Sequence, residues 1–402
     1  MDSTYIARQP IYDSKLKVVA YELLFRAEIY TNEASVVDGD SATTDVLLNA
    51  ITEIGMENLV GQHLAFVNLT YNHILQMAEK PFHELKERLV LEVLEDIKAE
   101  DEIVTAIQSL AHDGFCIALD DFIYDVSLQP LVDIAKIIKI DLKALSSEEL
   151  KEQVKQLADG KRKLLAEKVE TKEEFEYCQE LGFDYFQGYY FSRPQIIKGK
   201  KLPANKVATM KLLAQLQDSE SSMDELANLI SQDVTMSIRV LRYINSAQFG
   251  LGKEIESIQK ATVMLGRNAI RNIANLIAMS QVENKPHELI VIAMIRAKMA
   301  ENIAGLAHSN KDICFTTGLF SVIDALMDQE MGALIESLHL PQSMKSALLS
   351  HEGESGEILN CVIAYENGDW DNAVYAELNA KELQTSFLNA LKWANESANL
   401  FH

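Results

Sequence analysis

The run FCIALDD (115–121) is an apolar, partly β-branched stretch that ends on two aspartates. Five similar runs lie around it in the first half of the chain: LAFVN (64–68), RLVLE (88–92), IAKIIKID (134–141), KLLAE (163–167) and FDYFQ (183–187). Their polar residues recur at intervals of 19 to 28 residues, with helix-like stretches between them. Strands that alternate with helices at this spacing indicate βα units and a parallel sheet. So many successive units predict a closed (β/α) barrel of the TIM type.

The helices of this barrel are expected between the runs, near 71–86, 99–113, 127–135, 146–158 and 171–181. Thr171 and Glu174 form a capping box at the start of the last one. Upstream, residues 1–26 contain two strands, and residues 41–60 show helical spacing of apolar residues. The basic, proline-containing segment 191–205 closes a first domain that we place at residues 1–200.

From Leu202 onward the strand pattern stops and every long segment is helical in character. Ser222 and Glu225 form a capping box. In MSIRVLRYINSAQFG we expect one helix with Ile238, Leu241 and Ile244 on one face, ending at Gly250.

Two further helices are expected to break near Gly266, and another to follow Pro286. The prediction is an all-α domain over 201–402, with a core at about 201–340 and a helical segment after it. The acidic end of that segment, 360–402, carries Trp370 and Trp393 and has no role that the sequence assigns.

The composition is that of a soluble globular protein of two or three domains: 402 residues, 48% hydrophobic and 24% charged. A formal net charge of −23 argues against DNA or RNA as a partner, because nucleic-acid surfaces require basic patches. The four cysteines are far apart and form no CxxC pair, and no signal peptide or membrane span is recognisable. We therefore expect a reduced, cytoplasmic setting.

The candidate functional residues lie at the ends of the predicted strands. In a (β/α) barrel Glu22, Asn68, Glu92, Asp120 and Glu167 would converge at the mouth. Four carboxylates cannot share a dry pocket without a counter-charge, and hard divalent cations bound by oxygen ligands are the usual solution. Lys139 could orient or deprotonate a water, and Arg26 could pair with a phosphate. This set suits metal-assisted cleavage of a phosphodiester. The simpler alternative, that each acid caps a helix or faces solvent, explains one acid better than the whole set.

Several of these motifs resemble those of EAL-domain cyclic di-GMP phosphodiesterases: YELLFR, FVNLT, LVLEVLE, LDDF, IKID, LAEKVET and FQGYYFSRP, in that order over residues 1 to about 200. The resemblance implies metal ligation by Glu22, Asn68, Glu92, Asp120, Glu167 and Asp121. It implies Lys139 as the water-activating residue, with Glu170 and Gln187 as supporting groups, and Gln187 and Arg26 near the substrate. It also implies that Glu95 braces the loop after the two aspartates.

The sequence departs from the family pattern at three places. Leu23 replaces the alanine of the signature, and Lys168 replaces a glycine. The loop after Asp121 lacks its glycine, is shorter, and contains Ile123 and Val126, which adopt left-handed backbone angles only at a cost. The resemblance is therefore to a degenerate EAL domain that binds Mg²⁺, Mn²⁺ or Ca²⁺ weakly and turns over little.

The second half resembles an HDOD domain, a relative of HD phosphohydrolases, over about 200–340, through NSAQFG and MLG. GLFSVIDALM stands where HD enzymes carry a His-Asp pair, and His308, His339 and His351 are isolated.

The whole chain thus resembles bacterial EAL–HDOD (YuxH-like) signalling proteins. The first reading is a non-catalytic protein that senses cyclic di-GMP or acts as a scaffold and binds a protein partner through its helical domain. The alternative is an active, metal-dependent phosphodiesterase regulated by that domain. A homodimer, the partner and the cellular output are left open.

Overall fold

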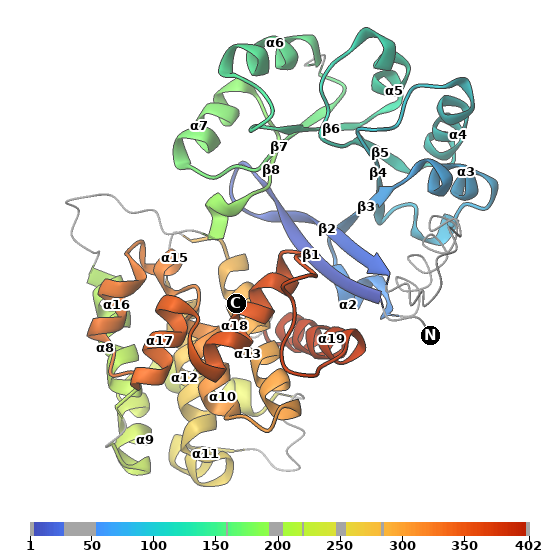
Figure 1. Ribbon diagram of the computed structural model, residues 1–402. Coiled ribbons are helices and arrows are strands. Elements are labelled where there is room, and N and C mark those ends of the chain that lie inside the picture. The colour runs from blue at the N-terminus through green and yellow to red at the C-terminus, as the bar shows by residue number, and fades with distance from the viewer. Residues whose placement is uncertain are drawn as a thin grey trace. The chain divides into compact units, whose positions relative to one another are not determined.

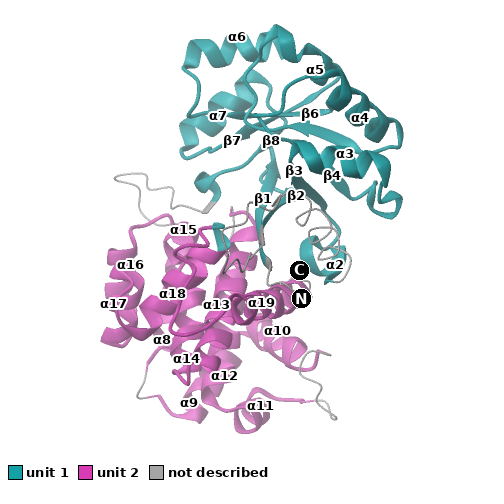
Figure 2. Ribbon diagram, turned by 45° about the vertical axis from the view of Figure 1, so that its right-hand side comes forward, with its two compact units in different colours: residues 1–191, 366–368 teal, residues 192–365, 369–402 magenta. Residues whose placement is uncertain are grey.

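The computed structural model describes residues 4–27, 54–157, 160–192, 204–218, 221–246, 255–282 and 285–398. Within these ranges the chain forms two compact units: residues 1–191 with 366–368, and residues 192–365 with 369–402 (Figure 2). The first contains all the described strands and the second is helical (Figure 1). The predicted fold classes, a TIM-like barrel followed by an all-α region, are confirmed.

Eight strands close the barrel in chain order. They are β1 (Thr4–Asp13), β2 (Val18–Ala27), β3 (Leu64–Leu69), β4 (Leu89–Val93), β5 (Cys116–Leu119), β6 (Ile137–Asp141), β7 (Lys163–Glu167) and β8 (Tyr185–Phe186). From β2 to β8 neighbouring strands are parallel, whereas β1 runs antiparallel to both β2 and β8. A tight turn joins β1 to β2, in which Asp13 Oδ1 accepts bonds from the backbone N–H groups of Lys15 and Lys17.

Helices lie outside the strands, as Figure 1 shows. The described ones are α2 (Met56–Val60), α3 (Tyr71–Glu79), α4 (Asp101–His112), α5 (Gln129–Ile134), α6 (Ser147–Leu157) and α7 (Lys172–Leu181), with 3₁₀ turns η1 (His83–Leu85), η2 (Val126–Leu128) and η3 (Tyr189–Ser192). The capping box of Thr171 and Glu174 is present. The helix expected over 71–86 ends earlier, at Glu79, because the following Pro81 disfavours helical angles in Lys80. Most of the helix expected over 41–60 lies outside the described residues.

One apolar layer fills the barrel interior. It contains Ile11, Ala20, Phe66, Val90, Ala118, Ile137 and Leu165, all buried. Side chains of a strand alternate between its two faces, so the residue two positions further along also points inward. Those positions are Glu22, Asn68, Glu92, Asp120, Lys139 and Glu167. The strands therefore place an inward polar layer directly above the apolar one.

The helical unit contains α8 (Ala204–Leu216), α9 (Met223–Ser231), α10 (Val234–Ile244), α11 (Ile258–Leu265), α12 (Arg267–Ser280), α13 (Glu288–Leu306), α14 (Lys311–Phe320), α15 (Ile323–Met327), α16 (Met331–Ser337), α17 (Gln342–Ser350), α18 (Gly353–Glu366) and α19 (Ala380–Ala398). The capping box of Ser222 and Glu225, the break at Gly266 and the helix after Pro286 are all present. α13 is buried on most of its surface and packs against α14 and α19. Trp393 of α19 makes an edge contact with Phe315, so the C-terminal segment belongs to this core.

Two expectations for α10 are wrong. Ile238 is 60% exposed, and the buried face consists of Met236, Val240, Tyr243 and Ile244. The apolar residues of this helix lie on more than one face, and packing on α9, α11 and α12 selects which face is buried. The helix also ends at Ile244, before Gly250, since the side chain of Asn245 bonds both backbone groups of Ile255.

Candidate functional site

Lys139 is the centre of the polar layer. Its side chain comes from the middle of β6 and is 1% exposed. Its Nζ lies 2.6 Å from Glu92 Oε1, 2.6 Å from Asp120 Oδ1, 3.0 Å from Glu167 Oε1 and 3.7 Å from Glu22 Oε2. Four strands thus bring one carboxylate each to a single buried ammonium group.

Two amides complete this cluster. Asn68 Nδ2 donates to Glu22 Oε1 at 3.1 Å, and Gln187 Nε2 donates to Glu22 Oε2 at 2.7 Å. Gln187 lies just after β8, where a Cβ on Gly188 would come within 2.3 Å of the carbonyl oxygen of Val169. Only glycine allows this approach, which brings the end of β8 against the end of β7. The structure therefore brings together Glu22, Asn68, Glu92, Asp120, Lys139, Glu167 and Gln187, as expected from the strand ends.

The charges in the cluster are unequally compensated. Burial raises the pKa of Glu92 well above its usual range, raises that of Asp120, and raises that of Glu167 to about 8, with Lys139 opposing each shift. Burial would also raise the pKa of Glu22, but Lys139 and the two amide donors outweigh it and lower that pKa. Burial disfavours the charged form of Lys139, yet the four carboxylates outweigh it and raise its pKa well above normal. One ammonium group cannot balance four buried carboxylates.

Several buried oxygens of the cluster, and one of the neighbouring Asp121, accept no hydrogen bond: Asn68 Oδ1, Glu92 Oε2, Glu167 Oε2, Gln187 Oε1 and Asp121 Oδ1. Such orphaned hard oxygens fit a divalent cation of the Mg²⁺, Mn²⁺ or Ca²⁺ kind. As placed, however, no three carboxylate, imidazole or thiol groups among the described residues surround a common metal position. The four carboxylates surround Lys139 instead, so a cation here would have to compete with its ammonium group.

The remaining expected residues lie at the rim. Asp121 follows β5 with a left-handed φ of 40°, and Lys168 follows β7 with a φ of 56°. Lys168 Nζ lies 2.6 Å from Asp141 Oδ2 and 3.6 Å from Asp121 Oδ2. Glu170 lies 3.4 Å from Lys143 Nζ. Arg26 lies within β2, but its side chain is outside the described part of the structure.

The loop after Asp121 corrects two expectations. Among its described residues only Asp121 has a left-handed φ, so Ile123 and Val126 carry none of the expected strain. An aspartate tolerates this conformation better than a β-branched residue, so the turn is made one step earlier. Gln153 of α6, not Glu95, braces the loop: its Nε2 donates to Phe122 O at 2.6 Å and its Oε1 accepts from Tyr124 N at 3.1 Å. Glu95 is exposed in the turn after β4.

Asp141 and Gln153 were not predicted as site residues. A sequence signal exists for Gln153, since it occupies a buried-face position of α6 beside Leu150, Val154 and Leu157. Asp141 ends β6 two residues after Lys139, so strand alternation indicates that its side chain lies on the same face of the strand as that of Lys139.

In the helical unit, GLFSVIDALM spans the end of α14 and α15. Burial raises the pKa of Asp324. Asp328 pairs with Lys285 and, at 2.7 Å, with Lys206. His308, His339 and His351 are exposed and lie in separate connections between helices. The Asp328 carboxylate is thus paired with two lysines, an arrangement suited to stabilising the fold.

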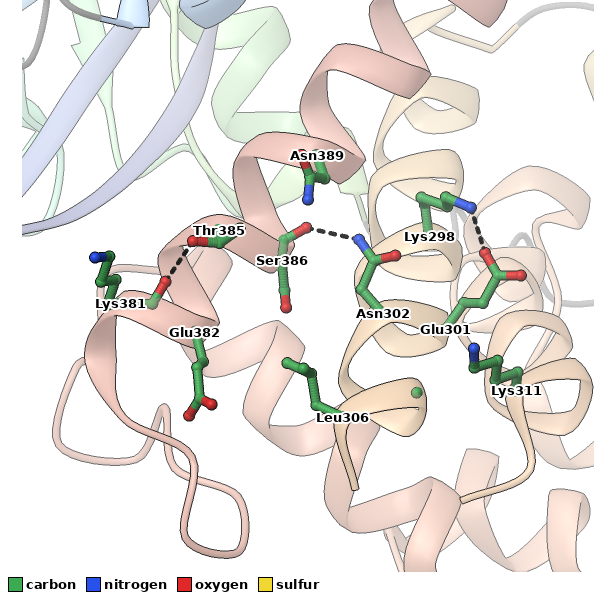
Figure 3. Close-up of a pocket in the computed structure, with 11 residues that line it drawn as sticks. Lys298, Glu301, Asn302, Leu306, Lys311, Lys381, Glu382, Thr385, Ser386 and Asn389 are labelled. Carbon is green, nitrogen blue, oxygen red and sulfur yellow. Dashed lines mark hydrogen bonds and ion pairs between the residues drawn. The ribbon is translucent and has the colours of Figure 1, made fainter. Parts of the chain in front are cut away.

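A hollow of about 620 Å³ lies between α13 and α19 (Figure 3). On its wall Lys298 pairs with Glu301 at 2.6 Å, and Asn302 Nδ2 donates to the carbonyl oxygen of Ser386 at 3.0 Å. The first pair lies within α13 and the second joins α13 to α19, so these polar groups are paired with one another and we assign no chemistry to this hollow.

Comparison with known proteins agrees with this division of the chain. The EAL domain model matches residues 3–194 and the HDOD domain model matches residues 202–352. The chain is 30% identical over 405 residues to "Cyclic di-GMP phosphodiesterase CdgJ" of Vibrio cholerae, covering 98% of this chain and 93% of the relative. It is 34% identical to "Uncharacterized protein YuxH" of Bacillus subtilis, covering 97% of this chain and 98% of the relative.

Among solved structures, the Bacillus subtilis YkuI protein in complex with c-di-GMP and calcium matches 58% of this chain and 73% of its own, at 20% identity and a TM-score of 0.39. The PaMucR phosphodiesterase, in a c-di-GMP complex, matches 51% of this chain and 99% of its own, at 21% identity and a TM-score of 0.38. Because both domain models match in order and the relatives cover nearly its whole length, the chain belongs to the EAL–HDOD family.

Proposed function

We propose that the barrel mouth binds cyclic di-GMP with the help of a weakly held divalent cation, and that the protein acts in bacterial signalling with little or no hydrolysis. The observation that carries the proposal is the convergence of Glu22, Glu92, Asp120 and Glu167 on Lys139, with oxygens left unpaired around them. The 30% identical relative named as a cyclic di-GMP phosphodiesterase supports the choice of ligand.

In this proposal the cation is Mg²⁺ or Mn²⁺, held by oxygens drawn from Glu22, Asn68, Glu92, Asp120 and Glu167, while Asp121 lies at the rim beside Lys168. A bound divalent cation would supply polarisation of a phosphate and a more acidic water. Gln187 and Arg26 would contact the nucleotide, and Glu170 would support the rim. The cysteines, all of them free, fit a reducing cytoplasmic setting. Protein contacts would be made by the helical domain, which we take to begin near residue 201.

Little hydrolysis is expected because of the state of Lys139. Four carboxylates within 3.7 Å of its Nζ outweigh burial and raise its pKa, which disfavours transfer of a proton from water to this group. Catalysis also requires reacting groups held to within about 0.5 Å. Here the position of Asp121 depends on its contact with Lys168, and that of the following loop on Gln153.

A second candidate function is metal-dependent hydrolysis of cyclic di-GMP under control of the helical domain. It is favoured by the retention of every donor around Lys139 and by the activity named for the Vibrio cholerae relative. The two candidate functions differ in the rate of cyclic di-GMP hydrolysis when the ligand is at a saturating concentration.

The test is a calorimetric titration of the full-length protein with cyclic di-GMP and Mn²⁺, beside a chromatographic assay for the linear dinucleotide. We expect metal-dependent binding and negligible product over hours. Lys172→Ala is the control, because Lys172 pairs with Glu176 on α7, away from the cluster. Rapid product formation that Glu22→Ala or Lys139→Ala abolishes, and Lys172→Ala does not, would establish the second candidate instead.

A further inference from the structure

Lys168 bridges the rim of the barrel mouth. It follows the last residue of β7, and its Nζ lies 2.6 Å from Asp141 Oδ2, at the end of β6, and 3.6 Å from Asp121 Oδ2, after β5. Three neighbouring strand ends are therefore joined by one ammonium group. The side chain is 52% exposed, so it can leave this position without unfolding the barrel.

The backbone of Lys168 is in an unfavourable conformation. Its φ of 56° lies in the left-handed region, which a glycine adopts without steric cost and a lysine does not. Ion pairs this exposed contribute little to stability. Stability alone therefore does not explain a lysine here, and an outlier of this kind beside a candidate site points to a role in that site.

The two aspartates that Lys168 contacts are suited to a divalent cation. Asp121 Oδ1 is buried and accepts no hydrogen bond, while Asp141 Oδ1 accepts from the backbone N–H of Lys143 and leaves Oδ2 to Lys168. Two carboxylates with water as the remaining ligands are a donor set that a divalent ion such as Mg²⁺ can use. The ammonium group of Lys168 occupies the place between these two carboxylates.

We propose that Lys168 is a built-in cation at the outer edge of the mouth, which keeps a second divalent ion away from Asp121 and Asp141. This inference rests on the proposed function, in which the inner carboxylates around Lys139 take one weakly held divalent ion. It makes Lys168 a residue that sets how many metal ions the mouth holds.

The experiment measures binding of Mn²⁺ alone to the full-length protein by calorimetry, with bound metal counted by elemental analysis. The variants are Lys168→Met, Lys168→Met with Asp121→Asn, and Lys172→Met. Lys172 is a matched control, because its side chain is also 52% exposed and ion-paired, four residues later on α7. Circular dichroism checks folding, and Lys168→Gly, which suits a φ of 56°, replaces Lys168→Met if that variant misfolds.

We expect one Mn²⁺ per chain for the unaltered protein and for Lys172→Met, and a second for Lys168→Met. The added Asp121→Asn should abolish the second ion. Equal binding by Lys168→Met and the unaltered protein would overturn the inference and leave the proposed metal site intact. So would two ions in the unaltered protein, or a second ion that survives Asp121→Asn. If neither the unaltered protein nor any Lys168 variant binds Mn²⁺, the metal part of the proposed function and the inference fail together.

Discussion

At the scale of single residues, Lys139 is the group on which the polar layer depends. Removing one partner of a buried ion pair leaves the other charge uncompensated and costs on the order of 3–5 kcal/mol. We expect Lys139→Met to lower the free energy of unfolding by about that amount in EDTA, because four carboxylates would face one another. Mn²⁺ should restore much of the loss, since it can take the vacated place.

Urea unfolding of this variant with EDTA and with Mn²⁺ measures both effects. The matched control is Lys136→Met, an exposed lysine just before β6, which should behave like the unaltered protein. Unchanged stability of Lys139→Met in EDTA would contradict the arrangement of charges described here.

Glu167 predicts a dependence of stability on pH. Burial raises its pKa to about 8 from an ordinary value of 4.5. Between these values the folded state holds a proton that the unfolded state releases, so the stabilising contribution is lost as pH rises through this window. We expect the urea midpoint in EDTA to fall from pH 6 to pH 8, and to fall less in Glu167→Gln, which keeps the uncharged form.

Glu173→Gln, at an exposed position in the first turn of α7, is the control for this change and should retain the full decrease. A decrease in Glu167→Gln as large as in the unaltered protein would show that the Glu167 carboxyl does not titrate in this range.

At the scale of elements, α6 positions the loop at the mouth through Gln153. Replacing Gln153 by leucine leaves Phe122 O and Tyr124 N without these partners, and an unsatisfied buried group costs about 1–3 kcal/mol. We expect Gln153→Leu to lose stability in this range and to show faster amide hydrogen exchange over residues 122–126.

The same helix supplies the control. Gln156 is exposed and bonds only Glu152 within its own helix, so Gln156→Leu should change neither quantity appreciably. Equal exchange of the loop in both variants would mean that Gln153 does not hold it.

The elements also show what the sequence could reveal. The strand-end position of Asn68 and its counterparts was enough to predict that they converge at the mouth, and the structure adds that Phe66, two positions earlier, lies in the apolar layer below. The loop after Asp121 could not be predicted in this way, because its path depends on a contact with Gln153 some 30 residues later. Similarly, Ile238 and Ile244 have the same kind of side chain, and only packing on neighbouring helices decides that one is exposed and the other buried.

At the scale of the whole molecule, the end of the strand-and-helix alternation near residue 200 predicted a barrel followed by an all-α region. The cluster around Lys139 was predicted as a set, since closure of a barrel brings all strand ends to one mouth. The contact of Lys168 with Asp141 was not, because it depends on the left-handed conformation of one residue. Regular sequence patterns thus predicted the architecture, whereas a contact that depends on the backbone angle of one residue, such as Lys168, could not be predicted from them.

The division of labour between the units leads to a last prediction. The described carboxylates that converge without enough positive charge are those of the barrel, whereas Asp328 of the helical unit is paired with Lys206 and Lys285. All metal binding of the full chain should therefore depend on the barrel. Asp120→Asn, which preserves shape but removes a charge from the cluster, should weaken Mn²⁺ binding measured by calorimetry at least about tenfold. Asp96→Asn, in the exposed turn after β4, should leave it unchanged. Mn²⁺ affinity that is the same in folded Asp120→Asn and in the unaltered protein would contradict a metal site that depends on the Asp120 carboxylate.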